Sequence, residues 1–76
     1  MIDFFGITFD SDWIYVEDAY DHDFKARGHI KFSRHTEEFY TSCTEVNQFK
    51  KGMFHVRRDI EKGKLGQHSD RTVVWG

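Results

Sequence analysis

Apolar and polar side chains alternate along several short stretches of the chain, as they do in β-strands that are buried on one side. Residues 2–9 alternate in this way and place Phe5, Ile7 and Phe9 on one side of an extended backbone. The turn sequence DSD separates them from the alternating residues 13–16. The pattern therefore predicts a β-hairpin at the start of the chain.

A second hairpin is expected further along the chain. Residues 27–33 alternate again, and residues 37–43 follow them after a short polar turn. The segment EDAYDHD, residues 17–23, shows neither strand nor helix periodicity, and we interpret it as a loop between the two hairpins. The sequence RTVVW predicts a last short strand over residues 71–75.

The apolar positions after residue 44 follow a helical period instead. Their spacings of 3, 4, 3 and 4 residues place them in one stripe along a helix. The stripe consists of Val46, Phe49, Met53, Val56 and Ile60. Ser42 with Glu45 fits a capping box, Thr44 is the alternative cap, and Gly63 suits the left-handed residue that ends a helix.

The order β-β-β-β-α-β predicts an α+β fold, in which one amphipathic helix packs on one face of a mainly antiparallel sheet of four to five strands. Residues 1–76 are expected to form a single domain, because a chain of 76 residues has no room for a second core.

One helix covers only one face of the sheet, yet both faces carry apolar side chains. The face toward the helix is expected to hold Phe5, Ile7, Phe9, Ile14, Val16, Ile30, Phe32 and Phe39. The far face would then expose Phe4, Trp13, Tyr15 and Tyr40. Aromatic side chains of this size rarely stay in water as one patch, so we expect a protein partner, first of all a second copy, to cover them.

Charge and cysteine content add to this picture. The net charge is −2, but residues 1–24 contain seven acidic and no Lys or Arg residues, whereas the remainder contains eleven basic and six acidic residues. The single cysteine excludes an internal disulfide and favours a reducing, cytoplasmic location. The chain has no apolar run of about 20 residues, so no membrane span is expected.

The acidic residues of the predicted loop, with His22 among them, are natural candidates for a metal site. They are Glu17, Asp18, Asp21 and Asp23. Neighbouring residues of an extended chain point in opposite directions, and the spacing does not match a calcium loop or a zinc site. We therefore expect a solvated loop, with no metal and no cofactor. Cys43 would be a reactive thiol only if the start of the helix lowered its pKa.

The predicted helix carries a basic ridge opposite its apolar stripe. Its members are Lys51, His55, Arg58 and Lys62, with Phe54 beside them. Such a ridge suits contact with nucleic-acid phosphates. Every amphipathic helix has a charged outer side, however, and acidic residues of the same helix dilute this one.

Together these patterns favour a small non-enzymatic binding protein of the regulator or inhibitor type, which forms homo-oligomers through the aromatic sheet face. Its compact size and lack of proline suit a bacterial or phage regulator, by analogy of scale alone. The alternative is a nucleic-acid-binding protein that uses the basic ridge and nearby aromatic residues. The second alternative is a small metal- or cysteine-dependent enzyme.

Overall fold

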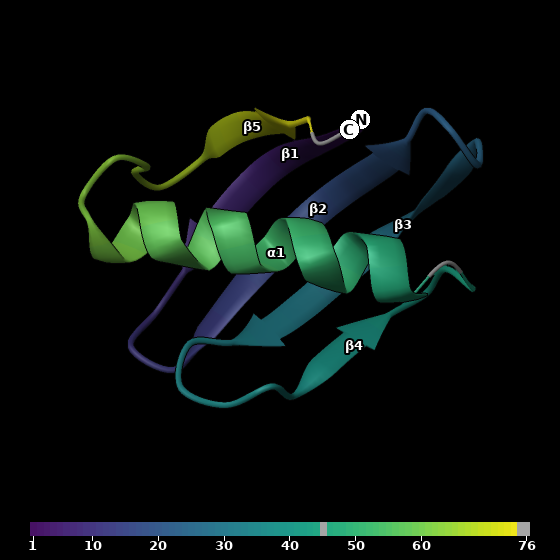
Figure 1. Cartoon of the computed structure of the whole chain (residues 1–76). Coiled ribbons are helices and arrows are strands. Elements are labelled where there is room, and N and C mark those ends of the chain that lie inside the picture. Colours follow the sequence, from purple (N-terminus) through teal and green to yellow (C-terminus); the bar gives the residue numbers. More distant parts are fainter. Residues whose placement is uncertain (45, 75–76) are drawn as a thin grey trace.

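A computed structural model describes residues 1–44 and 46–74. In these residues it contains five strands and one helix, in the order predicted from the sequence (Figure 1). The elements are β1 (Ile2–Phe9), β2 (Trp13–Asp21), β3 (Ala26–Ser33), β4 (Phe39–Thr41), α1 (Val46–Glu61) and β5 (Ser69–Val73). The strands form one antiparallel sheet in the order β4-β3-β2-β1-β5, which confirms the α+β fold class.

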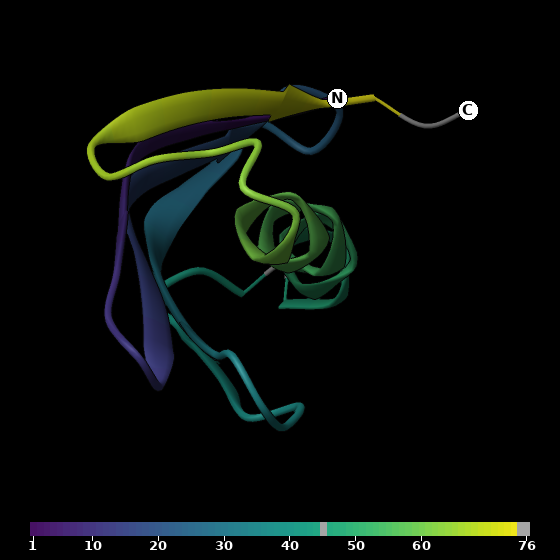
Figure 2. The same ribbon diagram turned by 90° about the vertical axis from the view of Figure 1, so that its left-hand side faces the viewer.

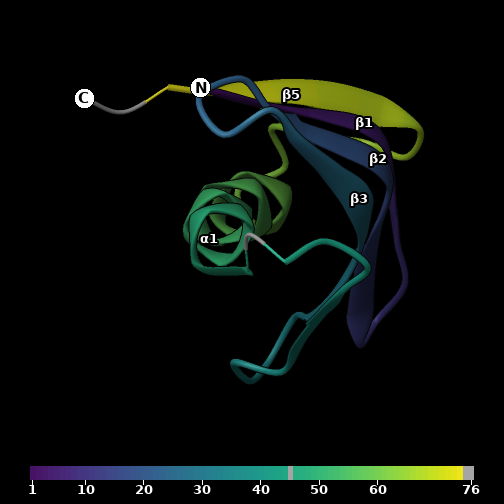
Figure 3. The same cartoon turned by 90° about the vertical axis from the view of Figure 1, so that its right-hand side faces the viewer.

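The sheet curls around α1, so that the helix lies against its concave face (Figures 2 and 3). The core fills the space between them with side chains from both layers. Its fully buried members include Ile2, Phe4, Ile7, Ile14, Phe32, Phe49, Met53 and Val56. On the opposite, convex face, which we call the outer face, no other element of the described chain covers the sheet.

The helix matches its prediction closely. Of the predicted stripe, all members except Val46 are buried. Gly63 has a φ of 72°, and the N–H groups of Gly63 and Lys64 donate to the carbonyls of Ile60 and Asp59. This pair of hydrogen bonds is the Schellman motif that ends many helices at a glycine.

The start of the helix is less fully described. The predicted capping box depends on Glu45, which lies outside the described residues. The hydroxyl of Ser42 has a different role, because it accepts a hydrogen bond from the backbone N–H of His29.

The prediction of an acidic loop over residues 17–23 is wrong. Glu17, Asp18 and Asp21 belong to β2, and the turn to β3 occupies only residues 22–25. The strand periodicity is interrupted because β2 is bulged: its register against β3 shifts between Val16 and Ala19. Both of these residues are buried although they are three positions apart, so the alternation breaks there.

The prediction that Phe4 lies on the outer face is also wrong. Phe4 is fully buried under the helix, and Phe5 is the exposed residue, with 40% of its surface accessible. The cause is Gly6, whose φ of 66° lies in the left-handed region and where the register of β1 against β5 shifts. Ile2 and Phe4 therefore face the helix before the shift, and Ile7 faces it afterwards.

Two arginines tie the helix to the sheet. Arg57 donates to the carbonyls of Ser33, the last residue of β3, and Thr36, in the turn that follows, at 3.0 and 2.7 Å. Arg71 on β5 donates to the buried carboxylate of Asp59 through two nitrogens, at 2.9 and 3.1 Å. In the described part of the chain, no helix is long and apolar enough to cross a membrane.

Candidate binding site on the outer face of the sheet

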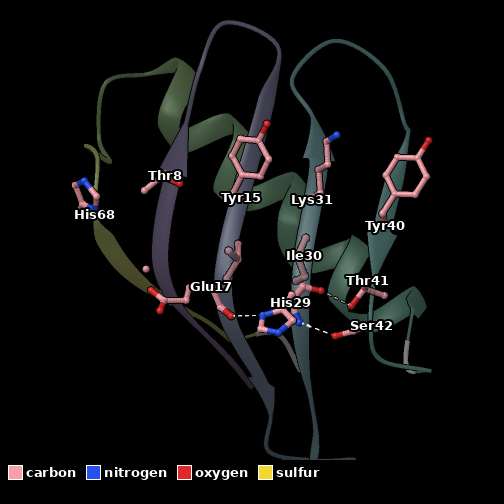
Figure 4. Close-up of a pocket in the computed structure, with 12 residues that line it drawn as sticks. Thr8, Tyr15, Glu17, His29, Ile30, Lys31, Tyr40, Thr41, Ser42 and His68 are labelled. Atoms are coloured by element: carbon pink, nitrogen blue, oxygen red, sulfur yellow. Dashed lines mark hydrogen bonds between the residues drawn. The ribbon is translucent and has the colours of Figure 1, made fainter.

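Three side chains stand side by side across the outer face. Tyr15 on β2 pairs with Lys31 on β3, and Lys31 pairs with Tyr40 on β4. Because neighbouring strands lie about 4.8 Å apart, directly paired residues on one face are in contact range. Figure 4 shows the three side chains pointing toward the same end of the sheet. We call them the Tyr–Lys–Tyr row.

Trp13 completes this group. Its ring centroid lies 6.2 Å from that of Tyr40, in a tilted arrangement, and the Nζ atom of Lys31 lies 4.2 Å from the centre of the Trp13 ring. The rings are only partly covered by these contacts, since Tyr15 is 38% and Tyr40 is 55% exposed. Three of the four residues predicted for the far face are therefore together, and Phe5 is on this face in place of Phe4.

A broad, open cavity of about 540 Å³ lies on the same face, and the row forms one side of it. Its other walls come from residues further along the strands and in the segments next to them: Gly6, Glu17, His29, Thr41, Ser42 and His68 (Figure 4). Gly6 leaves space there because it has no side chain. A volume of this size is typical of sites that hold a small molecule or a few side chains of a partner.

His29 is held in one orientation at the cavity wall. Its Nδ1 atom lies 2.6 Å from the carbonyl oxygen of Glu17. A carbonyl can only accept, so Nδ1 must carry a proton, and in the neutral ring Nε2 is then an acceptor. The backbone of His29 is fixed as well, because its N–H donates to Ser42 Oγ and its carbonyl accepts from Thr41 Oγ1 (Figure 4).

The carboxylate of Glu17 is the acidic group of this cavity. Its side chain lies directly over Gly6. Within residues 1–44 and 46–74 no cation pairs with it, and the basic side chain of the row, Lys31, extends toward Trp13 instead. At its end away from the row, the cavity thus presents two acceptors, the Glu17 carboxylate and His29 Nε2.

Local contacts set the protonation states of Asp10 and Tyr15, at and next to the row. The carboxylate of Asp10 accepts hydrogen bonds from the backbone N–H groups of Asp12 and Trp13, which hold the pKa of Asp10 below its usual range. Partial removal from water, with the nearby Asp10 charge, raises the pKa of Tyr15. The Tyr15 phenol therefore stays protonated and neutral at ordinary pH.

The other acidic residues of the predicted loop do not gather into one site. Asp18 pairs with Arg27 at 3.2 Å, and Asp23 pairs with the amino group of Met1 at 3.2 Å. Asp21 is buried and accepts the N–H of Asp23 in a tight turn. Among the described residues, no group of three or more His, Cys, Asp or Glu side chains lies close enough together to hold a metal ion.

Sequence reasoning missed a hydrogen-bonded cluster at the other end of the outer face. Asp3 accepts from Thr72 Oγ1 at 2.5 Å and lies 2.6 Å from His22 Nε2. These two partners, Thr72 first, lower the pKa of Asp3. Asp3 and Thr72 are directly paired on β1 and β5, strands from the two ends of the chain, so no local pattern could have indicated the contact.

The basic ridge lies on the helix, on the other side of the sheet from the row. Lys51, Arg58 and Lys62 are exposed, and the His55 ring contacts the Arg58 guanidinium at 3.1 Å. Phe54 is less available than predicted, because its ring packs edge-on against Phe32 with centroids 5.3 Å apart.

Cys43 is half-buried, packs against the core and forms no disulfide. It lies between β4 and α1, and a reactive thiol at this position stays a hypothesis.

A glycine inside a predicted strand, Gly6, is the one signal in the sequence that could have pointed to the cavity, since such glycines often mark a bulge.

Comparisons with protein families, with curated proteins and with solved structures found no match to this chain, so the outer face and the ridge are interpreted from their own chemistry.

Proposed function

We propose that this is a non-enzymatic binding protein that acts through contact with another protein, and that the outer sheet face is its contact surface. One observation carries the proposal: Tyr15 and Tyr40 expose their rings next to a cavity, with Trp13 beside them. Tyrosine and tryptophan are enriched at protein interfaces, and a few such anchors supply most of the binding energy.

The first partner we propose is a second copy of the chain. A two-fold interface needs a surface that is complementary to itself. The outer face meets this need because it carries a projecting row and an adjacent cavity. The single cysteine also supports a cytoplasmic location for such a dimer.

Sedimentation velocity over a wide range of protein concentration tests the proposal. The wild type should approach twice the monomer mass as concentration rises, and Tyr15→Ala with Tyr40→Ala should stay monomeric. Phe24→Ala is the matched control, since Phe24 is as exposed as Tyr40 but lies on the turn between β2 and β3. A wild type that is monomeric throughout, or a double variant that still dimerises, would contradict the proposal. Circular dichroism melts establish that each variant is folded.

The exposed basic ridge favours a second candidate function, nucleic-acid binding. In a dimer of outer faces, both ridges lie on the outside and stay accessible. Fluorescence anisotropy with short DNA and RNA tests this candidate. Phosphate-dominated binding should weaken severely between about 50 and 200 mM salt. It should also disappear in the double variant Arg58→Glu with Lys62→Glu.

A further inference from the structure

We infer that Glu17 of each copy receives the ammonium group of Lys31 from the second copy, across a two-fold axis through the outer faces. This contact rests on the proposed self-association and would be the polar interaction that orients it. Its starting point is an acid and a base that share one face without pairing.

The register of the strands places these two residues close together. Val16 pairs with Ile30 and Tyr15 with Lys31, so Glu17 and Lys31 lie diagonally across β2 and β3. Backbones in this relation are about 7–8 Å apart, within reach of long side chains. Yet Lys31 extends away from Glu17 (Figure 4), and its Nζ atom lies over the Trp13 ring. The middle member of the row, Lys31, is therefore a cation, and the cavity beside it contains an anion that no cation of the described residues neutralises.

A two-fold rotation turns this arrangement into a complementary one. If the axis lies in the interface plane, across the strands and between the row and Glu17, the row of each copy lies over the cavity of the other. Sheets pack face to face about 10 Å apart, a gap that an extended lysine and a glutamate span together. Both contacts form at once, as an isologous interface requires.

Lys31 lines one end of the cavity, and the chemistry of the other end, around Glu17 and His29, selects a cation rather than an anion. An ammonium group carries three donors and no acceptor, and the cavity offers the Glu17 carboxylate and the Nε2 acceptor of His29. The same two acceptors disfavour a phosphate at this place. A nucleic acid would therefore bind at the helix ridge rather than here.

A charge-exchange experiment tests the inference directly. Glu17→Lys and Lys31→Glu each place like charges at both contacts, and each variant alone should dimerise about tenfold more weakly or not at all. An equimolar mixture restores opposite charges at both contacts, so it should form a heterodimer. Native mass spectrometry with one variant labelled with nitrogen-15 identifies that heterodimer.

Matched controls separate charge from position. Glu61→Lys and Lys64→Glu make the same changes at exposed sites on and just after the helix, and they should dimerise like the wild type. Glu17→Gln and Lys31→Met keep the side-chain size, so they should weaken the dimer even if a charge reversal prevents folding. Their mixture should not recover.

The outcomes distinguish this inference from the proposal on which it rests. If the wild type dimerises and the tyrosine variants do not, but the mixture of exchanged charges fails to associate, the Glu17–Lys31 contact is wrong and the outer-face dimer stands. The contact is also wrong if Glu17→Gln and Lys31→Met dimerise like the wild type. If the wild type never dimerises, both fail.

Discussion

Gly6 lies directly beneath the side chain of Glu17. A β-carbon on residue 6 would come within 2.7 Å of Glu17 Oε2 and 2.9 Å of Glu17 Cβ. The glycine therefore does two things: it allows the left-handed backbone of the bulge in β1, and it leaves room for the carboxylate at the cavity. The bulge that turns Phe4 into the core and Phe5 toward the outer face therefore also shapes the candidate site.

Gly6→Ala should lower the free energy of unfolding by about 2 kcal/mol or more, because it adds a left-handed backbone cost of roughly 1–2 kcal/mol to the overlap with Glu17. Urea denaturation measures the loss. Gly66→Ala is the control, since a β-carbon there meets nothing within 4 Å, and it should change stability by less than about 0.5 kcal/mol. Equal losses of stability at the two positions would show that residue 6 needs neither the left-handed backbone nor the space under Glu17.

Arg57 should contribute more to stability than its exposed neighbour Arg58. Its guanidinium binds one carbonyl at the end of β3 and one in the turn that follows, and it stacks on Phe32 at 4.6 Å. Arg57→Ala should therefore cost about 2 kcal/mol in urea denaturation. Both hydrogen bonds come from Nη1, so a lysine ammonium could replace them, but it lacks the planar guanidinium that stacks on Phe32. Arg57→Lys should therefore recover only part of the loss. A full recovery by lysine, or an equal loss in Arg58→Ala, would refute this role.

The Asp59–Arg71 pair joins α1 to the edge strand β5. The Asp59 side chain is only 8% exposed, whereas Arg71 is 41% exposed. Arg71→Met leaves the carboxylate without its partner and should cost about 2 kcal/mol, below the range for fully buried pairs because water reaches this arginine. Adding Asp59→Leu should recover most of the loss. A double variant as unstable as the sum of the two single variants would show that the residues do not interact.

The Asp3 cluster predicts a stability difference that depends on pH. The pKa of Asp3 is lowered in the folded protein, chiefly by the hydrogen bond from Thr72. The stability that this hydrogen bond adds is therefore present above the unfolded pKa of about 3.9. It is lost as pH falls through the lower pKa of the folded protein. Thr72→Val should cost about 1 kcal/mol at neutral pH.

That difference should shrink toward zero in strong acid, where Asp3 is protonated in both proteins. Urea denaturation of wild type and Thr72→Val at neutral and acidic pH gives the comparison. A difference that is independent of pH would mean that packing of the threonine methyl group, rather than the charged hydrogen bond, is responsible.

The helix and the order of the elements could be predicted because they depend on local periodicity. The 3-and-4 spacing from Phe49 to Ile60 survives folding unchanged, and Gly63 ends the helix by its own backbone freedom. The sheet faces on which Phe4 and Phe5 lie could not be predicted. One bulged residue shifts the alternation, so every side chain before it lies on the opposite face from the one expected.

The candidate site was predictable only in part, for the same reason. Alternation was enough to place Trp13, Tyr15 and Tyr40 on one face. The cavity depends on pairings between distant strands, which bring Gly6 under Glu17 and the Glu17 carbonyl to His29. Residue types alone do not encode such pairings, and the bulge in β2 hides the strand character of the acidic stretch.

The outer face, rather than the helix ridge, is the contact surface that we propose. Its most direct test is a series of heteronuclear NMR spectra of the wild type, recorded from dilute to concentrated solution. We predict shifts that grow with concentration for Tyr15, Lys31 and Tyr40, while signals of Lys51 and Arg58 stay constant. Shifts confined to the ridge residues, or no shifts at any concentration, would contradict the proposal.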